Sequence, residues 1–134
     1  MLEDPFQLPS IPAAEALSRA RDESFLSRAR AESSLRDRPA TGLRATLIDL
    51  RKPPAVLTSG HRIKGAEVRD PFTFGHQDPL MQANGPLITF CVHGHEVSQF
   101  ACALLMLHGR NACYVLGGYE ALVAAGAALE DISK

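Results

Sequence analysis

Residues 86–109 constrain the fold of this 134-residue chain more than any other stretch. Pro86 to Phe90 is an apolar run of strand length that leads directly into Cys91. A short loop follows, and Ser98 then opens an apolar pattern with helical spacing that Gly109 ends. A strand, a loop and a helix N-terminus in this order leave unpaired backbone N–H groups that favour an anion. The pattern fits a reactive thiolate at Cys91 and an inert cysteine buried at a strand end equally well.

The composition is that of an ordinary globular domain, with 46% hydrophobic and 22% charged residues. A net charge of −1 gives no sign of a nucleic-acid or membrane partner, and no apolar run approaches the roughly 20 residues of a membrane helix. The acidic N-terminus lacks the basic and apolar segments of a signal peptide. The three cysteines form no disulfide or Cys-x-x-Cys framework. We therefore expect a single domain with reduced thiols in the cytoplasm.

Short apolar runs alternate with helical patterns along most of the chain. The pattern predicts strands over residues 45–49, 66–68, 86–90 and 112–116, and helices over residues 98–108 and 119–128. Such alternation is typical of a parallel α/β sheet with right-handed crossovers. Two prolines limit residues 72–81 to a short helix at most.

Residues 1–40 are expected to form a mostly helical N-terminal extension. Prolines make its first residues an extended lead-in that can reach the sheet through Phe6, Leu8 and Ile11. Arginines and carboxylates alternate in the remainder, which is typical of a solvated helix face rather than of an anion-binding surface. This helical arm is a candidate contact for a homodimer or another partner.

Four landmarks in a fixed order resemble the rhodanese (sulfurtransferase) family. They are Leu47-Ile48-Asp49-Leu50-Arg51, Gly60-His61-Arg62-Ile63-Lys64-Gly65-Ala66, Cys91 with its loop, and Val115-Leu116-Gly117-Gly118-Tyr119. That family has a strand ending in Asp-x-Arg, a Gly-His-Ile-x-Gly-Ala-like loop, a Cys-x-x-Gly active loop before a helix, and a Gly-Gly-aromatic turn. The resemblance places a rhodanese-like domain at residues 41–134. It implies an α/β fold with a five-stranded, mainly parallel sheet flanked by helices on both faces.

The resemblance also implies that Cys91 carries sulfur. Its thiolate would take the outer sulfur of thiosulfate or a similar donor anion, and a thiol or a protein cysteine would accept that sulfur from the persulfide. The substrate-binding loop implied for this chemistry comprises Val92, His93, Gly94, His95, Glu96, Val97 and Ser98. Neither a metal nor an organic cofactor is expected. The string from Cys91 to Ser98 further resembles rhodanese domains associated with chromate-resistance proteins.

Three further residues are expected to support the loop from the same edge of the sheet: Asp49, Arg51 and Lys64. Arg51 and Lys64 would attract an anionic donor, although a structural interaction of Arg51 with Asp49 or with the backbone is an equal alternative.

The ionisable side chains of the loop have their own alternatives. His93 and His95 are expected to shape the pocket or assist proton transfer. The alternative of a zinc site that joins them with Cys91 lacks an evident fourth ligand. Glu96 would repel a dianion, so its carboxylate is expected to point outward or to pair with a basic group.

The loop from Cys91 to Val97 departs from the family pattern, because its seven residues are one more than usual. Loops of that length mark phosphatase relatives of the fold and arsenate reductases, but those phosphatases end the loop in arginine, where this chain has Val97. Three hypotheses follow. The first is a sulfurtransferase, the second is a noncatalytic rhodanese module for protein binding or oxyanion sensing, and the third is an oxyanion reductase or phosphatase-like enzyme. Cys102 and Cys113 are expected to be reduced core residues.

Overall fold

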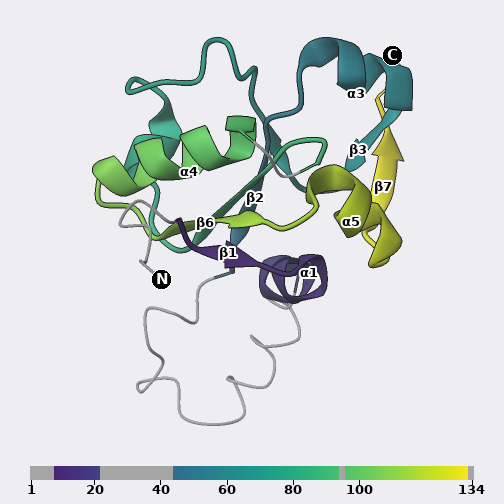
Figure 1. Ribbon diagram of the computed structural model, residues 1–134, viewed down its shortest axis with the longest axis horizontal. Helices are drawn as coiled ribbons and strands as arrows, with labels where there is room; N and C mark the ends of the chain where they lie inside the picture. Colours follow the sequence, from purple (N-terminus) through teal and green to yellow (C-terminus); the bar gives the residue numbers. More distant parts are fainter. Residues whose placement is uncertain (1–7, 22–43, 94–95, 133–134) are drawn as a thin grey trace, which may run out of the picture.

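The computed structural model describes residues 8–21, 44–93 and 96–132 of the chain (Figure 1). Its elements are β1 (Ser10–Ile11), α1 (Ala13–Arg21), β2 (Thr46–Asp49), α3 (Pro53–Ser59), β3 (His61–Ile63), β4 (Glu67–Val68), the 3-10 helix η2 (Pro79–Gln82), β5 (Leu87–Phe90), α4 (Glu96–Leu107), β6 (Ala112–Val115), α5 (Gly118–Ala124) and β7 (Leu129–Asp131). Phe6 and most of the predicted helical arm lie outside the described residues.

Five strands form the main sheet in the order β1-β6-β5-β2-β4, and every neighbouring pair is parallel. β5 is the central strand, and all four of its residues are buried. A strand that is covered on both faces has no exposed side, which is why β5 is a continuous apolar run in the sequence rather than an alternating one. The predicted α/β fold with a five-stranded, mainly parallel sheet is therefore confirmed.

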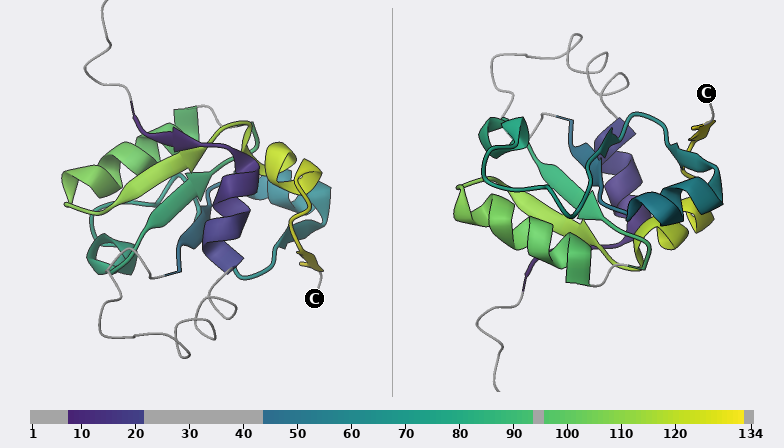
Figure 2. Two further views of the ribbon diagram at one scale, coloured as in Figure 1. Left: turned by 90° about the horizontal axis from the view of Figure 1, so that it is seen from below. Right: turned by 90° about the horizontal axis from the view of Figure 1, so that it is seen from above.

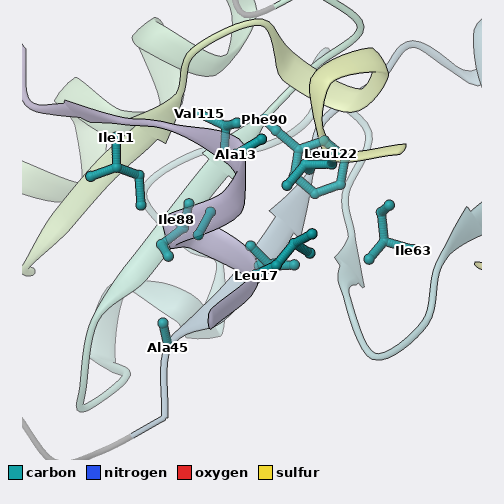
Figure 3. Close-up of a cluster of buried hydrophobic side chains, with 11 residues drawn as sticks. Ile11, Ala13, Leu17, Ala45, Ile63, Ile88, Phe90, Val115 and Leu122 are labelled. Carbon is teal, nitrogen blue, oxygen red and sulfur yellow. The ribbon is translucent and has the colours of Figure 1, made fainter. Parts of the chain in front are cut away.

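Helices cover both faces of this sheet (Figure 2). Successive strand residues point to opposite faces, so Leu87 packs in one hydrophobic cluster and Ile88 in the other. The cluster with Leu87 lies under α4 and η2. The cluster with Ile88 lies under α1 and α5, and Figure 3 shows Leu17 and Leu122 among its side chains. The two clusters hold the carboxyl end of β5 between the helical layers.

β1 and α1 pack against the main sheet as part of the folded domain, although the sequence predicts an N-terminal extension over residues 1–40. β1 pairs with β6, with Ile11 opposite Val115, so the predicted contact of Ile11 with the sheet is confirmed. In α1 the spacing of Ala13, Ala16 and Leu17 forms one apolar stripe, and all three side chains are buried.

Two features were not predicted from the sequence. The first is α3, which has no buried residue and therefore no apolar stripe to reveal it. The second is an antiparallel pair formed by β3 and β7, which joins segments far apart in the chain. Arg62 Nε donates to Glu130 Oε2 across this pair at 2.6 Å. In addition, α4 begins at Glu96, two residues before the predicted start at Ser98. Within the described ranges, no helix is long and apolar enough to cross a bilayer.

Candidate active site

Cys91 directly follows the central strand β5 at the carboxyl edge of the sheet. Ligands of open parallel sheets bind at this edge. The Cys91 side chain is only 7% exposed, yet it forms part of the wall of a cavity of about 270 Å³. Cys91 therefore borders a space of the size that a small donor needs. Gly94 and His95 of the predicted loop lie outside the described residues.

A buried hydroxyl faces the sulfur of Cys91. The thiol donates to Ser98 Oγ at 3.4 Å, and Ser98 is fully buried in the first turn of α4. When the thiol ionises, the hydroxyl can reverse its role and donate its proton to the sulfur. Thr89 holds this turn against β5, because its Oγ1 donates to the backbone carbonyl of Ser98 at 2.8 Å. The pair of Cys91 and Ser98 is thus fixed between a strand and a helix.

The cavity at Cys91, which we call the cysteine pocket, has a largely apolar wall. Four apolar residues contribute to it: Leu50, Ala55, Val92 and Val97. Its ionisable residues are Arg51, Lys52, His93 and Glu96. Glu96 is exposed, as expected for a carboxylate that would repel an anionic donor.

Arg51 is held by Asp49 beside the cysteine pocket. Nε and Nη2 of Arg51 donate to the two carboxylate oxygens of Asp49 at 3.0 and 2.8 Å, and the two side chains are 1% and 0% exposed. Nη1 also donates to Ser59 Oγ at 3.1 Å, and the guanidinium lies 3.8 Å from the centroid of the Tyr119 ring. Arg51 therefore makes the structural ion pair that the sequence offered as one of two alternatives. Its charge is already compensated inside the fold.

The first turn of α5 holds the backbone of Cys91 and Val92. The backbone N–H of Tyr119 donates to the carbonyl of Cys91 at 2.7 Å, and that of Glu120 donates to the carbonyl of Val92 at 3.3 Å. Gly117 permits this approach, because its φ is +81° and a Cβ there would lie 2.7 Å from the Cβ of Ala121. His93 Nδ1 lies 3.8 Å from Glu120 Oε1.

Lys64 is not brought to Cys91. It lines a different cavity of about 250 Å³ together with Arg44, Thr46 and Glu67. β4 runs parallel to β2, so the chain must return to the amino edge of the sheet before β4 begins, and Lys64 lies in that return. The expectation that Lys64 shares the edge of Cys91 is therefore corrected.

A second cavity of about 350 Å³ adjoins the cysteine pocket. The two cavities share the wall residues Leu50, Lys52, Glu96 and Val97. Beyond them, the second cavity is lined by Pro71, Phe72, Phe74, Phe100 and Ala101, and we call it the phenylalanine groove. Phe72 is 73% exposed and Phe100 is 63% exposed. No local pattern in the sequence predicts this groove, because its walls come from three separate segments.

The other two cysteines are poor nucleophiles. Cys102 is fully buried in α4, and its burial, followed by the charge of Cys113, raises its pKa to about 12. Burial also raises the pKa of the Cys113 thiol. Both thiols are therefore protonated at neutral pH.

We expect the free energy of unfolding to decrease between pH 9 and pH 12 because of Cys102. Its ordinary pKa is 9.0 and its pKa in the fold is about 12, so the unfolded chain releases this proton first as the pH rises. Between these two pKa values, the free energy of unfolding decreases by about 1.4 kcal/mol per pH unit because of this thiol. Below pH 9 the thiol adds no pH dependence to the stability. Urea unfolding at pH 8, 9 and 10 should show the wild type losing stability faster than Cys102→Ala. Parallel curves for the two proteins would contradict the burial argument.

The zinc alternative involves His95, which is not among the described residues. Within the part of the chain that the structure describes, no three His, Cys, Asp or Glu side chains gather into a group that could hold a metal ion.

Comparison with known proteins supports the fold. No family model and no curated protein sequence matches the chain. A rhodanese-like domain protein from Staphylococcus aureus matches with a TM-score of 0.58 and 21% identity over 94% of this chain and 100% of that one. A rhodanese-related protein from Thermoplasma volcanium matches with a TM-score of 0.57 and 18% identity over 91% and 97% of the two chains.

Two further solved structures share the fold. A thiosulfate sulfurtransferase from Pseudomonas aeruginosa has a TM-score of 0.59 and 17% identity over 98% of this chain, which spans 21% of that protein. A protein of unknown function from Rhodopseudomonas palustris, named a possible tyrosine phosphatase, has a TM-score of 0.60 and 18% identity over 92% and 85% of the two chains. At these identities the likeness concerns the fold alone. The chain has a rhodanese-like fold, with Cys91 at the carboxyl edge of its central strand.

Proposed function

We propose that this protein is a sulfurtransferase that carries sulfane sulfur as a persulfide on Cys91. The observation that carries the proposal is the placement of the Cys91 thiol, which borders a pocket and lies 3.4 Å from the buried hydroxyl of Ser98. The rhodanese-like fold, which one thiosulfate sulfurtransferase shares, supports the same class of chemistry.

In the first half-reaction the Cys91 thiolate attacks the outer sulfur of a sulfane donor. A bond forms between Sγ and that sulfur while the sulfur–sulfur bond of the donor breaks, and the electron pair of the broken bond departs with the remainder of the donor. With thiosulfate, a thiolate and a dianion become a persulfide anion and sulfite, so charge is conserved. Ser98 donates its hydroxyl proton in a hydrogen bond to the charged cysteine sulfur, and the N-terminal end of α4 favours negative charge nearby.

In the second half-reaction an acceptor thiolate attacks the outer sulfur of the persulfide. The bond between the two sulfur atoms breaks, its electron pair returns to Sγ, and the Cys91 thiolate is regenerated. No other described cysteine needs to take part, because Cys102 and Cys113 stay protonated.

The phosphatase-like alternative has less support. The loop offers Val97 at the position where phosphatase relatives hold phosphate with arginine, and Arg51 is already bound by Asp49. The noncatalytic module differs from the proposal in one observable property, since it would form no persulfide on Cys91.

Formation of thiocyanate from cyanide and a sulfane donor tests the proposal. We expect turnover with the wild-type protein and only the uncatalysed background with Cys91→Ser, because serine cannot hold the sulfur. Cys113→Ser is the matched control and should keep the activity. Absence of turnover with thiosulfate and with organic thiosulfonates would favour the noncatalytic module. Hydrolysis of an aryl phosphate that Cys91→Ser abolishes would favour the phosphatase.

A further inference from the structure

We propose that the preferred sulfur donor is a monoanion that carries an apolar organic group, and that this group binds in the phenylalanine groove. An organic thiosulfonate, R–SO₂–S⁻ with an aromatic R, represents this class. The inference rests on the proposed function and names the substrate class of the same site.

The two cavities lie side by side. The phenylalanine groove adjoins the cysteine pocket, and Leu50 and Val97 line both. A donor whose outer sulfur reaches Cys91 therefore has space on one side for a group attached to its other end. Thiosulfate has no such group and would leave the groove empty.

Two aromatic side chains of the groove are largely exposed. Phe72 and Phe100 are 73% and 63% exposed, and Phe100 lies on α4, whose buried side chains include Leu104 and Leu105. Both rings therefore have apolar surface that an aromatic R group would remove from water. Phe74, which is 8% exposed, also lines the groove.

The ionisable side chains around the two cavities are paired with groups of opposite charge. In the cysteine pocket, the charge of Arg51 is compensated by its buried pair with Asp49, and His93 Nδ1 lies 3.8 Å from Glu120 Oε1. Lys52 lies in the wall that both cavities share, but Glu96 lies in the same wall with the opposite charge. A dianion gains little from such a balanced surface, whereas a single negative charge beside an apolar group matches it.

The chemistry of such a donor is balanced at the same cysteine. The Cys91 thiolate attacks the terminal sulfur of R–SO₂–S⁻, the bond between that sulfur and the sulfonyl sulfur breaks, and the sulfinate R–SO₂⁻ leaves with the electron pair. One persulfide anion and one sulfinate anion replace one thiolate and one thiosulfonate. No external oxidant or reductant is needed.

Two probes with the same reacting group test the inference: benzenethiosulfonate and methanethiosulfonate. The rate constant for persulfide formation on Cys91 is measured for each, and the phenyl-to-methyl ratio is compared between proteins, so the intrinsic reactivities of the donors cancel. We expect the ratio in the wild type to exceed that in Phe72→Ala/Phe100→Ala by about tenfold, because apolar pockets discriminate by such factors for a few carbon atoms. Leu107→Ala removes an even more exposed apolar side chain on α4 outside the groove, and it should leave the ratio unchanged.

The outcomes separate the inference from the proposed function. If both probes form the persulfide and the double variant keeps the phenyl-to-methyl ratio of the wild type, the inference is overturned but the proposed function is not. A ratio that falls equally in Leu107→Ala would also overturn it, because the effect would not be specific to the groove. No persulfide with either probe or with thiosulfate would overturn the proposed function itself.

Discussion

Replacing Arg51 by methionine is expected to lower the free energy of unfolding by about 3–5 kcal/mol. The substitution leaves the carboxylate of Asp49 fully buried without the three guanidinium hydrogen bonds that it now accepts. It also removes the donor to Ser59 and the cation above the Tyr119 ring. Urea unfolding at neutral pH measures the loss.

Two further variants give this prediction its controls. Arg62→Met breaks an ion pair with Glu130 whose side chains are 44% and 36% exposed, so it should cost less than about 1 kcal/mol. Asp49→Leu combined with Arg51→Met removes both buried charges and should recover part of the loss. If Arg51→Met lowers the free energy of unfolding no more than Arg62→Met does, the buried ion pair of Arg51 and Asp49 does not stabilise the fold as its geometry indicates.

The second large effect is expected at Ser98. Ser98→Ala should slow persulfide formation about 10- to 100-fold, because a hydrogen bond to a charged group contributes about 1.5–3 kcal/mol. The loss should appear in the first half-reaction, where the sulfur of Cys91 is most negative. Thr89 donates to the backbone carbonyl of Ser98 rather than to its side chain, so its contact with α4 does not depend on the hydroxyl.

Single-turnover mass measurements at several donor concentrations test the effect of Ser98→Ala. Thr58→Ala, an exposed hydroxyl on α3, serves as the control and should react at the wild-type rate. A wild-type rate in Ser98→Ala would show that its hydroxyl does not stabilise the reacting sulfur.

Much of the fold could be predicted from sequence because the buried strands leave a strong pattern. The strands predicted at 45–49, 86–90 and 112–116 each match an observed strand to within one residue at either end. Parallel strands covered on both faces are continuously apolar, and this signal is local. The pairing of β3 with β7 has no local signal, because its partners are brought together only by the folded core.

The site was predictable where it depends on chain order and not where it depends on three-dimensional packing. The position of Cys91 between a strand and a helix follows from neighbouring residues, and so does the proximity of Asp49 and Arg51. Lys64 was assigned to the wrong edge, because the return of the chain before β4 is a property of sheet topology. Phe100 fitted the apolar pattern of the helix, but it lies on the exposed face and lines the groove.

The intact mass of the protein after incubation with a sulfane donor shows whether Cys91 carries sulfur. We expect the wild type to gain one sulfur atom, about 32 Da, and to lose it to a thiol, and we expect no gain in Cys91→Ser. Cys91 does not carry the sulfur if the wild type gains none from thiosulfate or a thiosulfonate, or if Cys91→Ser gains it equally.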